Sequence, residues 1–182
     1  DYPTIKNVGT INVMVKAENP NYAPATANYV LNVSAKEVTV TADAASKTYG
    51  ETDPELTATV TGLIGSDVVN YNVIRESGED AGTYVITTSG EEIQGNYKVT
   101  YKPGTFTINK ADMTVTTQGY DGTYDGQSHG GSVTPSVTEG TTISYSTDGG
   151  QNWTTTPPTR TDAGETEVLV KVENDNYNTV ND

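Results

Sequence analysis

The sequence contains no cysteine, and this absence excludes several kinds of chemistry at once. Without a thiol, the chain can form neither a disulfide nor a thiolate metal site, and it has no cysteine nucleophile. It has a single histidine, His129, which precedes two glycines and lacks the motif of a hydrolase nucleophile. We therefore expect no catalytic residue, no metal-ligating residue and no resident cofactor, and we expect His129 to be a solvated loop residue.

Basic residues are also scarce. The chain has 10 Lys and Arg against 24 Asp and Glu, a formal net charge of −14. Nucleic acids and anionic membranes bind basic surfaces, so neither is an expected partner. The sequence also lacks a run of about 20 apolar residues that could cross a bilayer, so no membrane insertion is expected.

Leucine is rare, and residues branched at Cβ are abundant. The chain has 4 Leu against 20 Val and 32 Thr, a composition that suits pleated sheets better than helices. Gly, Pro, Asn and Asp recur about every 8–12 residues, the spacing of turns between short strands. The sequence therefore predicts an all-β protein of tandem small β-sandwich modules with immunoglobulin-like topology. A β-grasp-like module is the alternative, because residues 65–70 could form a short helix.

One pattern occurs three times along the chain: Asn or Asp, a small apolar residue, Gly, an alternating strand, and then Asn-Tyr. The copies run from Asn7 to Tyr22, from Asp80 to Tyr97 and from Asp162 to Tyr177. The Gly of each opening turn is free to adopt positive φ. The alternating residues Val13, Val15 and Ala17, and likewise Val168, Val170 and Val172, are predicted to face a core. The Tyr of Asn-Tyr is expected to cover the end of a module and keep its hydroxyl in water.

A second match sets the module length. Val38–Ala42 leads to Tyr49-Gly50, and Met113–Thr117 leads to Tyr124-Asp125-Gly126, at an offset of 75 residues. A period of this size predicts whole domains in tandem. We expect an N-terminal segment (1–34) with the last strands of a truncated module, a complete middle module (35–109), and a C-terminal module (110–182) that lacks its last strand. The chain is thus predicted to be part of a longer protein.

The middle module carries an ordered series of motifs, Lys47–Leu56 with its Tyr49-Gly50, then Val60–Leu63, Ala81–Tyr84, Gly95–Tyr97 and Phe106–Ile108. In this series it resembles the MBG family of bacterial adhesin repeats. The C-terminal module is similar to related repeats with Tyr-Asp-Gly, here Tyr124-Asp125-Gly126. The resemblance implies a place in large, repetitive, extracellular proteins that are secreted or attached to the bacterial cell wall. The family has no catalytic residues to transfer, and its ligands are generally not assigned.

Three functions follow as alternatives. The first is a non-enzymatic stalk or spacer of an adhesin, the second a module that binds mucin or other glycans, and the third an accessory domain of a polysaccharide-degrading enzyme. The candidate partners are the neighbouring modules of the parent protein and host or bacterial glycans. A second copy of the chain is a further candidate, because the N-terminal strands of one molecule could complete the C-terminal module of the next, head to tail.

The candidate ligand-contact residues are aromatic: Tyr120, Tyr124, Tyr145 and Trp153. Trp153 closes the pattern Ser146-x-Asp148-x-Gly150-x-x-Trp153, which has Asp-box spacing and predicts a folded hairpin with Trp153 as a plug of the core. The residues assigned structural roles in the motifs are Tyr49, Gly50, Gly82, Tyr84, Asn96, Tyr97, Tyr124, Asp125, Gly126, Asp148, Gly150, Trp153, Gly164, Asn176 and Tyr177.

Oxygen-rich loops are the one route to a metal ion. Asp121, Asp125 and Asp148 lie beside glycines in predicted loops, and such loops can bind Ca²⁺. No twelve-residue calcium loop with its terminal Glu is present, so ordinary Asx turns are the expected role of these residues. Calcium remains the only candidate ion.

Overall fold

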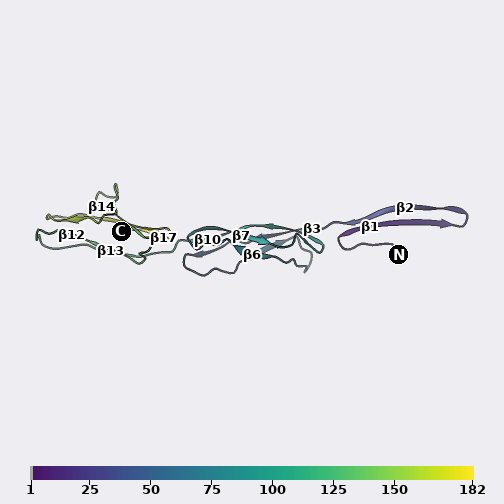
Figure 1. Cartoon of the computed structure of the whole chain (residues 1–182), viewed down its shortest axis with the longest axis horizontal. Helices are drawn as coiled ribbons and strands as arrows, with labels where there is room; N and C mark the ends of the chain where they lie inside the picture. The colour runs from purple at the N-terminus through teal and green to yellow at the C-terminus, as the bar shows by residue number, and fades with distance from the viewer. Residues whose placement is uncertain (1) are drawn as a thin grey trace. The chain divides into compact units, whose positions relative to one another are not determined.

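The computed structural model describes residues 2–182, and Figure 1 shows them as strands joined by loops. No described residue lies in a helix, so the all-β prediction is confirmed. Within residues 2–182, no helix has the length and apolar character of a membrane span. Contacts divide the chain into two compact units: one comprises the residues up to Ala44, Glu55–Glu76 and Val85–Thr105, and the other comprises Ala45–Pro54, Ser77–Tyr84 and Phe106–Asp182.

The first unit begins with a long two-stranded antiparallel sheet. Strand β1 (Gly9–Asn19) pairs with β2 (Tyr22–Val33), in register from Gly9 opposite Val33 to Ala17 opposite Ala25. The prediction that Val13, Val15 and Ala17 face a core is wrong, since Val13 is half-buried and the other two are exposed. The physical reason is that β1 and β2 form a sheet of their own, and two strands alone cannot bury a face.

The main core of the first unit lies on a four-stranded sheet of order β5-β3-β9-β8. Its strands are β3 (Lys36–Ala42), β5 (Ala58–Thr61), β8 (Ile93–Gln94) and β9 (Tyr97–Lys102). Strand β3 alternates buried and less buried residues, and its central position in the sheet explains why Val38 and Val40 are at most 1% exposed. It runs antiparallel to β5 but parallel to β9. Val69, Tyr97 and Val99 complete the buried cluster.

A second sheet has the order β4-β10-β7-β6. Its strands are β4 (Ala45–Thr48), β6 (Asn72–Arg75), β7 (Gly82–Ser89) and β10 (Gly104–Asn109). Strand β6 is antiparallel to β7, whereas β10 is parallel to β4, with Phe106 opposite Ala45. Phe106 and Ile86 are fully buried. Residues 65–70 form a turn and coil, so the short helix on which the β-grasp alternative depended is not formed.

The remaining strands of the second unit belong to the C-terminal module. They are β11 (Val115–Gln118), β12 (His129–Gly130), β13 (Ser132–Pro135), β14 (Thr142–Ser146), β15 (Thr159–Arg160), β16 (Leu169–Asn174) and β17 (Tyr177–Asn181). They form the pairs β11-β13 and β12-β15 and the three-stranded sheet β14-β16-β17. Val170 and Val172 are buried with Met113 and Tyr145, and Val168 packs against them half-buried. The prediction of this core face is confirmed.

Candidate functional site

The hairpin after β14 is built around one carboxylate. The Asp148 carboxylate accepts hydrogen bonds from the Ser146 hydroxyl (2.7 Å), the Gln151 N–H (3.0 Å) and the Asn152 N–H (2.9 Å). The Asn152 side-chain amide donates a further bond at 2.6 Å. The backbone and side-chain N–H groups of Asn152, followed by the Ser146 hydroxyl, lower the pKa of Asp148 to about 2. The predicted hairpin is confirmed, and its Asp is engaged in holding the turn.

Trp153 does not plug the core. It is 38% exposed, its indole N–H donates to the Gly150 carbonyl oxygen at 3.1 Å, and the Lys171 ammonium lies 5.3 Å from its ring centroid. The core prediction is therefore wrong. Trp153 stays at the surface because the turn supplies the partner of its indole N–H, while Met113 and the valines of β16 fill the interior.

A hollow in the C-terminal module gathers three of the four predicted ligand-contact residues, Tyr120, Tyr124 and Tyr145. Tyr120 and Tyr124 are 52% and 66% exposed, whereas Tyr145 is buried. The His129 ring stacks on Tyr120 with 3.9 Å between centroids and 1° between planes. Two aromatic side chains are thus offered to solvent at one place, and their binding to a ligand stays a prediction.

His129 is not the solvated loop residue that was expected. It lies in β12, which pairs with β15, and its side chain is 27% exposed. Its Nε2 lies 3.0 Å from Asp125 Oδ1, and this contact, followed by the Gln127 N–H, lowers the pKa of Asp125. Two local contacts, the stacking on the Tyr120 ring and the Asp125 carboxylate, favour the half-buried position of His129.

Residues 2–182 contain no preformed cluster of metal-ligating side chains. No group of three or more His, Asp or Glu residues there could hold an ion. Asp125 and Asp148 are bound to the partners described above. Calcium at these loops stays a prediction for a binding experiment.

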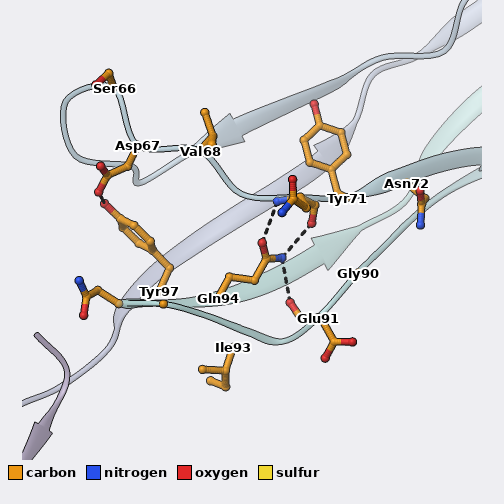
Figure 2. A pocket seen from close by; sticks show the side chains of 13 residues that line it. Ser66, Asp67, Val68, Tyr71, Asn72, Gly90, Glu91, Ile93, Gln94 and Tyr97 are labelled. Carbon is orange, nitrogen blue, oxygen red and sulfur yellow. Dashed lines mark hydrogen bonds between the residues drawn. The ribbon is translucent and has the colours of Figure 1, made fainter.

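The middle module has a hollow whose polar groups are largely used within the protein (Figure 2). The Gln94 side chain lies at its centre: its Oε1 accepts from the Asn70 N–H at 2.7 Å, and its Nε2 donates to the Asn70 oxygen at 2.8 Å. Nε2 also donates to the Glu91 carbonyl and to the Tyr101 hydroxyl, both at 3.1 Å. The arrangement fixes the surrounding loops rather than presenting an unpaired group to a ligand.

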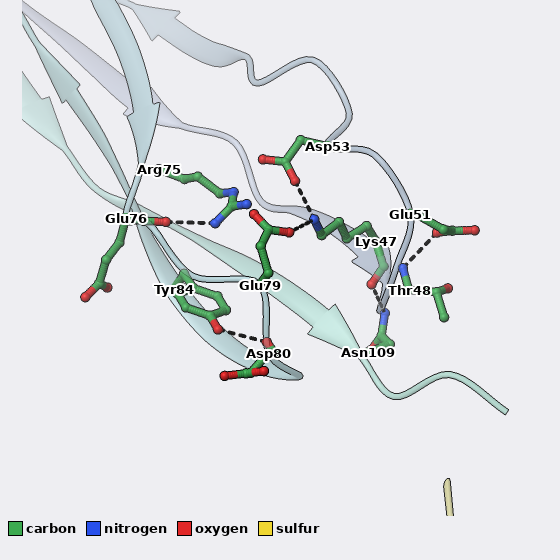
Figure 3. Close-up of polar contacts among 10 residues, drawn as sticks. All are labelled: Lys47, Thr48, Glu51, Asp53, Arg75, Glu76, Glu79, Asp80, Tyr84 and Asn109. Atoms are coloured by element: carbon green, nitrogen blue, oxygen red, sulfur yellow. Dashed lines mark hydrogen bonds and ion pairs between the residues drawn. The ribbon is translucent and has the colours of Figure 1, made fainter. Parts of the chain in front are cut away.

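Lys47, in the Tyr-Gly motif, is buried and ion-paired (Figure 3). Its ammonium lies 2.8 Å from Asp53 Oδ1 and also binds the Glu79 carboxylate. These partners, Asp53 first and then Glu79, raise the pKa of Lys47. A lysine with a raised pKa stays charged and is a poor nucleophile at neutral pH. Its structural consequence is to hold the loop after β4 to the loop before β7.

The Asn96-Tyr97 turn of the middle module contacts the N-terminal segment. The Val8 N–H donates to Asn96 Oδ1 at 2.8 Å, and Asn96 Nδ2 donates to Asn7 Oδ1 at 3.2 Å. A backbone N–H can only donate, so it fixes which end of the amide faces Val8. One side chain therefore makes two bonds to the Asn-x-Gly turn of the N-terminal segment.

The second junction repeats these contacts atom for atom. The Ala81 N–H donates to Asn176 Oδ1 at 2.7 Å, and Asn176 Nδ2 donates to Asp80 Oδ1 at 3.0 Å. Here the acceptor is a carboxylate, which makes a stronger bond than an amide oxygen. We call this pair of bonds, from the Asn of Asn-Tyr to the side chain and the next N–H of an Asx-x-Gly turn, the asparagine clamp.

The backbone of each clamp asparagine binds its own module. The Lys36 N–H donates to the Asn96 oxygen at 2.9 Å, and the Ala111 N–H donates to the Asn176 oxygen at 3.0 Å. Lys36 pairs in parallel with Tyr97, and Ala111 with Tyr177. Each clamp asparagine thus faces the start of its own module with its carbonyl and the preceding segment with its side chain.

The tyrosines that follow the clamp asparagines differ. The ring of Tyr177 meets that of Tyr49 edge to face, with 5.4 Å between centroids and 70° between planes. Tyr97 is buried, and its hydroxyl donates to Asp67 at 2.5 Å (Figure 2). The same hydroxyl accepts from the Ile64 N–H at 3.1 Å. The prediction of a hydroxyl in water is wrong for Tyr97, because the loop after β5 supplies both partners. The bond to the Asp67 carboxylate raises the pKa of Tyr97.

The other motif residues lie in turns or, as Gly82 and Tyr84 do, at the start of β7. Tyr84 is half-buried, and its hydroxyl donates to the Asp80 carbonyl at 2.8 Å (Figure 3). The motif glycines outside the strands have positive φ between 76° and 132°, as predicted for turns; they are Gly50, Gly126, Gly150 and Gly164. Gly82, the first residue of β7, has a nearly extended φ of 159°.

These contacts belong largely to the motifs that suggested a family. Residues 38–107 match the family model described as MBG domain (YGX type). The match confirms the resemblance for the middle module; the clamp partners Asn7 and Asn176 lie outside the matched span. An MBG domain is compatible with the repeat region of a surface protein. No curated protein and no solved structure matches the chain.

Two features of the structure were not predicted from the sequence, the asparagine clamp and the buried ion pairs of Lys47. The clamp asparagine and its Asx-x-Gly partner were both visible as repeated motifs, but nothing in the pattern indicated that they meet. Lys47 occupies an inward position of β4, and a lone Lys in a strand is the signal that could have pointed to a buried ion pair.

Proposed function

We propose that this chain is a non-catalytic repeat region of a bacterial cell-surface or secreted protein, and that it acts as the stalk or spacer of an adhesin. The observation that supports this proposal most is the asparagine clamp, which occurs with the same atoms at both junctions. A stalk made of repeats is stabilised by each repeat and by each interface between neighbours. A repeated interface is what such a function requires.

The acid groups also favour a non-catalytic role. Glycosidases need a carboxyl group whose pKa is raised, so that it can act as a general acid. The pKa values of Asp43, Asp125 and Asp148 are lowered instead, each by hydrogen-bond donors nearby. These carboxylates serve as fixed acceptors in loops.

Nuclear magnetic relaxation tests the stalk function. If the clamps restrict the junctions, the ¹⁵N relaxation rates of the intact chain should give one common rotational correlation time for the middle and C-terminal modules. The Asn176→Ala variant should give the two modules separate and shorter correlation times. Independent tumbling of the modules in the unaltered chain would contradict a spacer held by its junctions.

Glycan binding is the second candidate, because Tyr120 and Tyr124 are exposed beside one hollow. Sugar rings stack on exposed tyrosine faces. The intact chain should then bind one class of mucin, host glycan or wall polysaccharide saturably, and Tyr124→Ala should abolish the binding. Tyr22→Ala is the matched control, since Tyr22 is 77% exposed but lies outside the hollow. Loss of binding in EDTA would indicate calcium; equal binding by both variants would exclude the hollow.

A further inference from the structure

We propose that the Asp162-Ala163-Gly164 turn docks the Asn21-Tyr22 turn of a second copy of this chain through a third asparagine clamp. The inference rests on the junction role proposed above and extends it from contacts within one chain to contacts between chains. Two occupied clamps define the geometry that the third must reproduce.

The acceptor half of the third clamp is open. Asp162 and Ala163 are exposed, and among residues 2–182 neither the Asp162 carboxylate nor the Ala163 N–H has a hydrogen-bond partner. Arg160 holds the turn through the carbonyl oxygens of Asp162 (2.8 Å) and Ala163 (3.0 Å). The two groups that the clamp uses are therefore left available on a restrained turn.

The donor half is open as well. The Asn21 N–H donates to Asn19 Oδ1 at 2.9 Å, as the Asn176 N–H donates to Asn174 Oδ1 at 3.0 Å. The turn around Asn21 is thus bonded in the same way as the turn of an occupied clamp. Within the described part of the chain, the Asn21 side-chain amide has no partner.

An aromatic pair accompanies the docked turn. Tyr124 lies 75 residues after Tyr49, and Tyr22 matches Tyr177 in the Asn-Tyr motif. Tyr49 and Tyr177 form the edge-to-face contact of the second junction. Tyr22 and Tyr124 are 77% and 66% exposed, so their contact would remove two exposed rings from water.

Charge sets the conditions for docking. Each chain has a net charge of −14, so two copies repel one another at low ionic strength. At about 0.15 M salt the Debye length is about 8 Å, which screens this repulsion but leaves the short-range clamp bonds in place. The contact is small, and a dissociation constant of about 1 mM is the scale on which it should be sought.

The test follows individual amide signals of the intact chain in ¹H–¹⁵N spectra, from about 0.05 to about 2 mM protein at about 0.15 M salt. We expect the Ala163 backbone amide and the Asn21 side-chain amide to shift together with concentration. The Ala81 amide, already clamped, should not shift. Asn21→Ala and Asp162→Ala should each abolish the shifts. Asn28→Ala, at an exposed asparagine of the adjoining strand β2, should leave them unchanged.

Two results would overturn the proposal: the absence of concentration-dependent shifts up to the highest concentration, or shifts that persist in the Asn21→Ala variant. Unchanged signals of Met113 and Val172 would show that the variants remain folded. Failure of the stalk function is recognised separately, because independent tumbling of the modules would be seen at the lowest concentration.

Discussion

Replacing Asn176 by alanine removes one clamp while leaving the strands around it intact. The variant loses a bond from the Ala81 N–H and a bond to the Asp80 carboxylate. A neutral hydrogen bond contributes about 1 kcal/mol net and one to a charged group about 1.5–3 kcal/mol. Because Asp80 is exposed, the lower figures apply, and we expect a loss of about 2–3 kcal/mol in the free energy of opening the junction.

Hydrogen exchange of the Ala81 amide is the direct assay. A loss of about 2 kcal/mol corresponds to exchange about 30-fold faster. Asn181→Ala is the matched control, because Asn181 is exposed in β17, the strand that follows Asn176, and its side chain has no hydrogen bond among the described residues. The double-mutant cycle of Asn176→Ala with Asp80→Ala should give a coupling energy of about 1 kcal/mol. Unchanged exchange at Ala81, or a coupling energy below about 0.3 kcal/mol, would refute the clamp as an energetic contact.

Three further outcomes follow from the polar contacts. The pKa of Asp148 is about 2 in the folded protein against 3.8 for an ordinary Asp, so its contribution to stability should be lost as the pH falls from the higher value to the lower. Asp148→Asn should remove this pH dependence from the unfolding transition, as measured by Trp153 fluorescence. The pKa of Lys47 is raised above 10.5, so its contribution is complete below that pH and lost above it, and Lys47→Met should flatten the alkaline decline of the urea midpoint. Tyr97→Phe removes the acceptor of the Ile64 N–H and should speed exchange of that amide; unaltered exchange would show that the bond contributes nothing.

The strand content was predictable because it depends on local features. Alternation in Val38 and Val40, and in Val170 and Val172, identifies the face of a strand that is buried. Alternation does not identify the partner strand. The parallel pairs of β3 with β9 and β4 with β10 join residues about 60 positions apart, and no period in the sequence indicates them.

The errors at single residues have a common physical origin. The positions of Trp153 and His129 were predicted from the chemistry of each side chain alone. Their exposure depends on neighbours that the fold supplies, the Gly150 carbonyl for Trp153 and the Tyr120 ring for His129. Val15 shows the converse, because its strand has the pattern of a buried face but its sheet has only two strands. Pattern predicts the tendency to be buried, and topology decides whether a covering layer exists.

The parallel pairing of the middle module has a mechanical consequence. Strand β3 is the first strand of that module and β10 the last, and each is hydrogen-bonded to a parallel neighbour. Tension transmitted along the polypeptide acts along such strands and loads the pair in shear. The two strands must slide past one another, so their hydrogen bonds break together. Antiparallel hairpins pulled at their open end release one bond at a time. The same number of hydrogen bonds therefore resists a larger force, a property that a folded spacer needs and a merely stable domain does not.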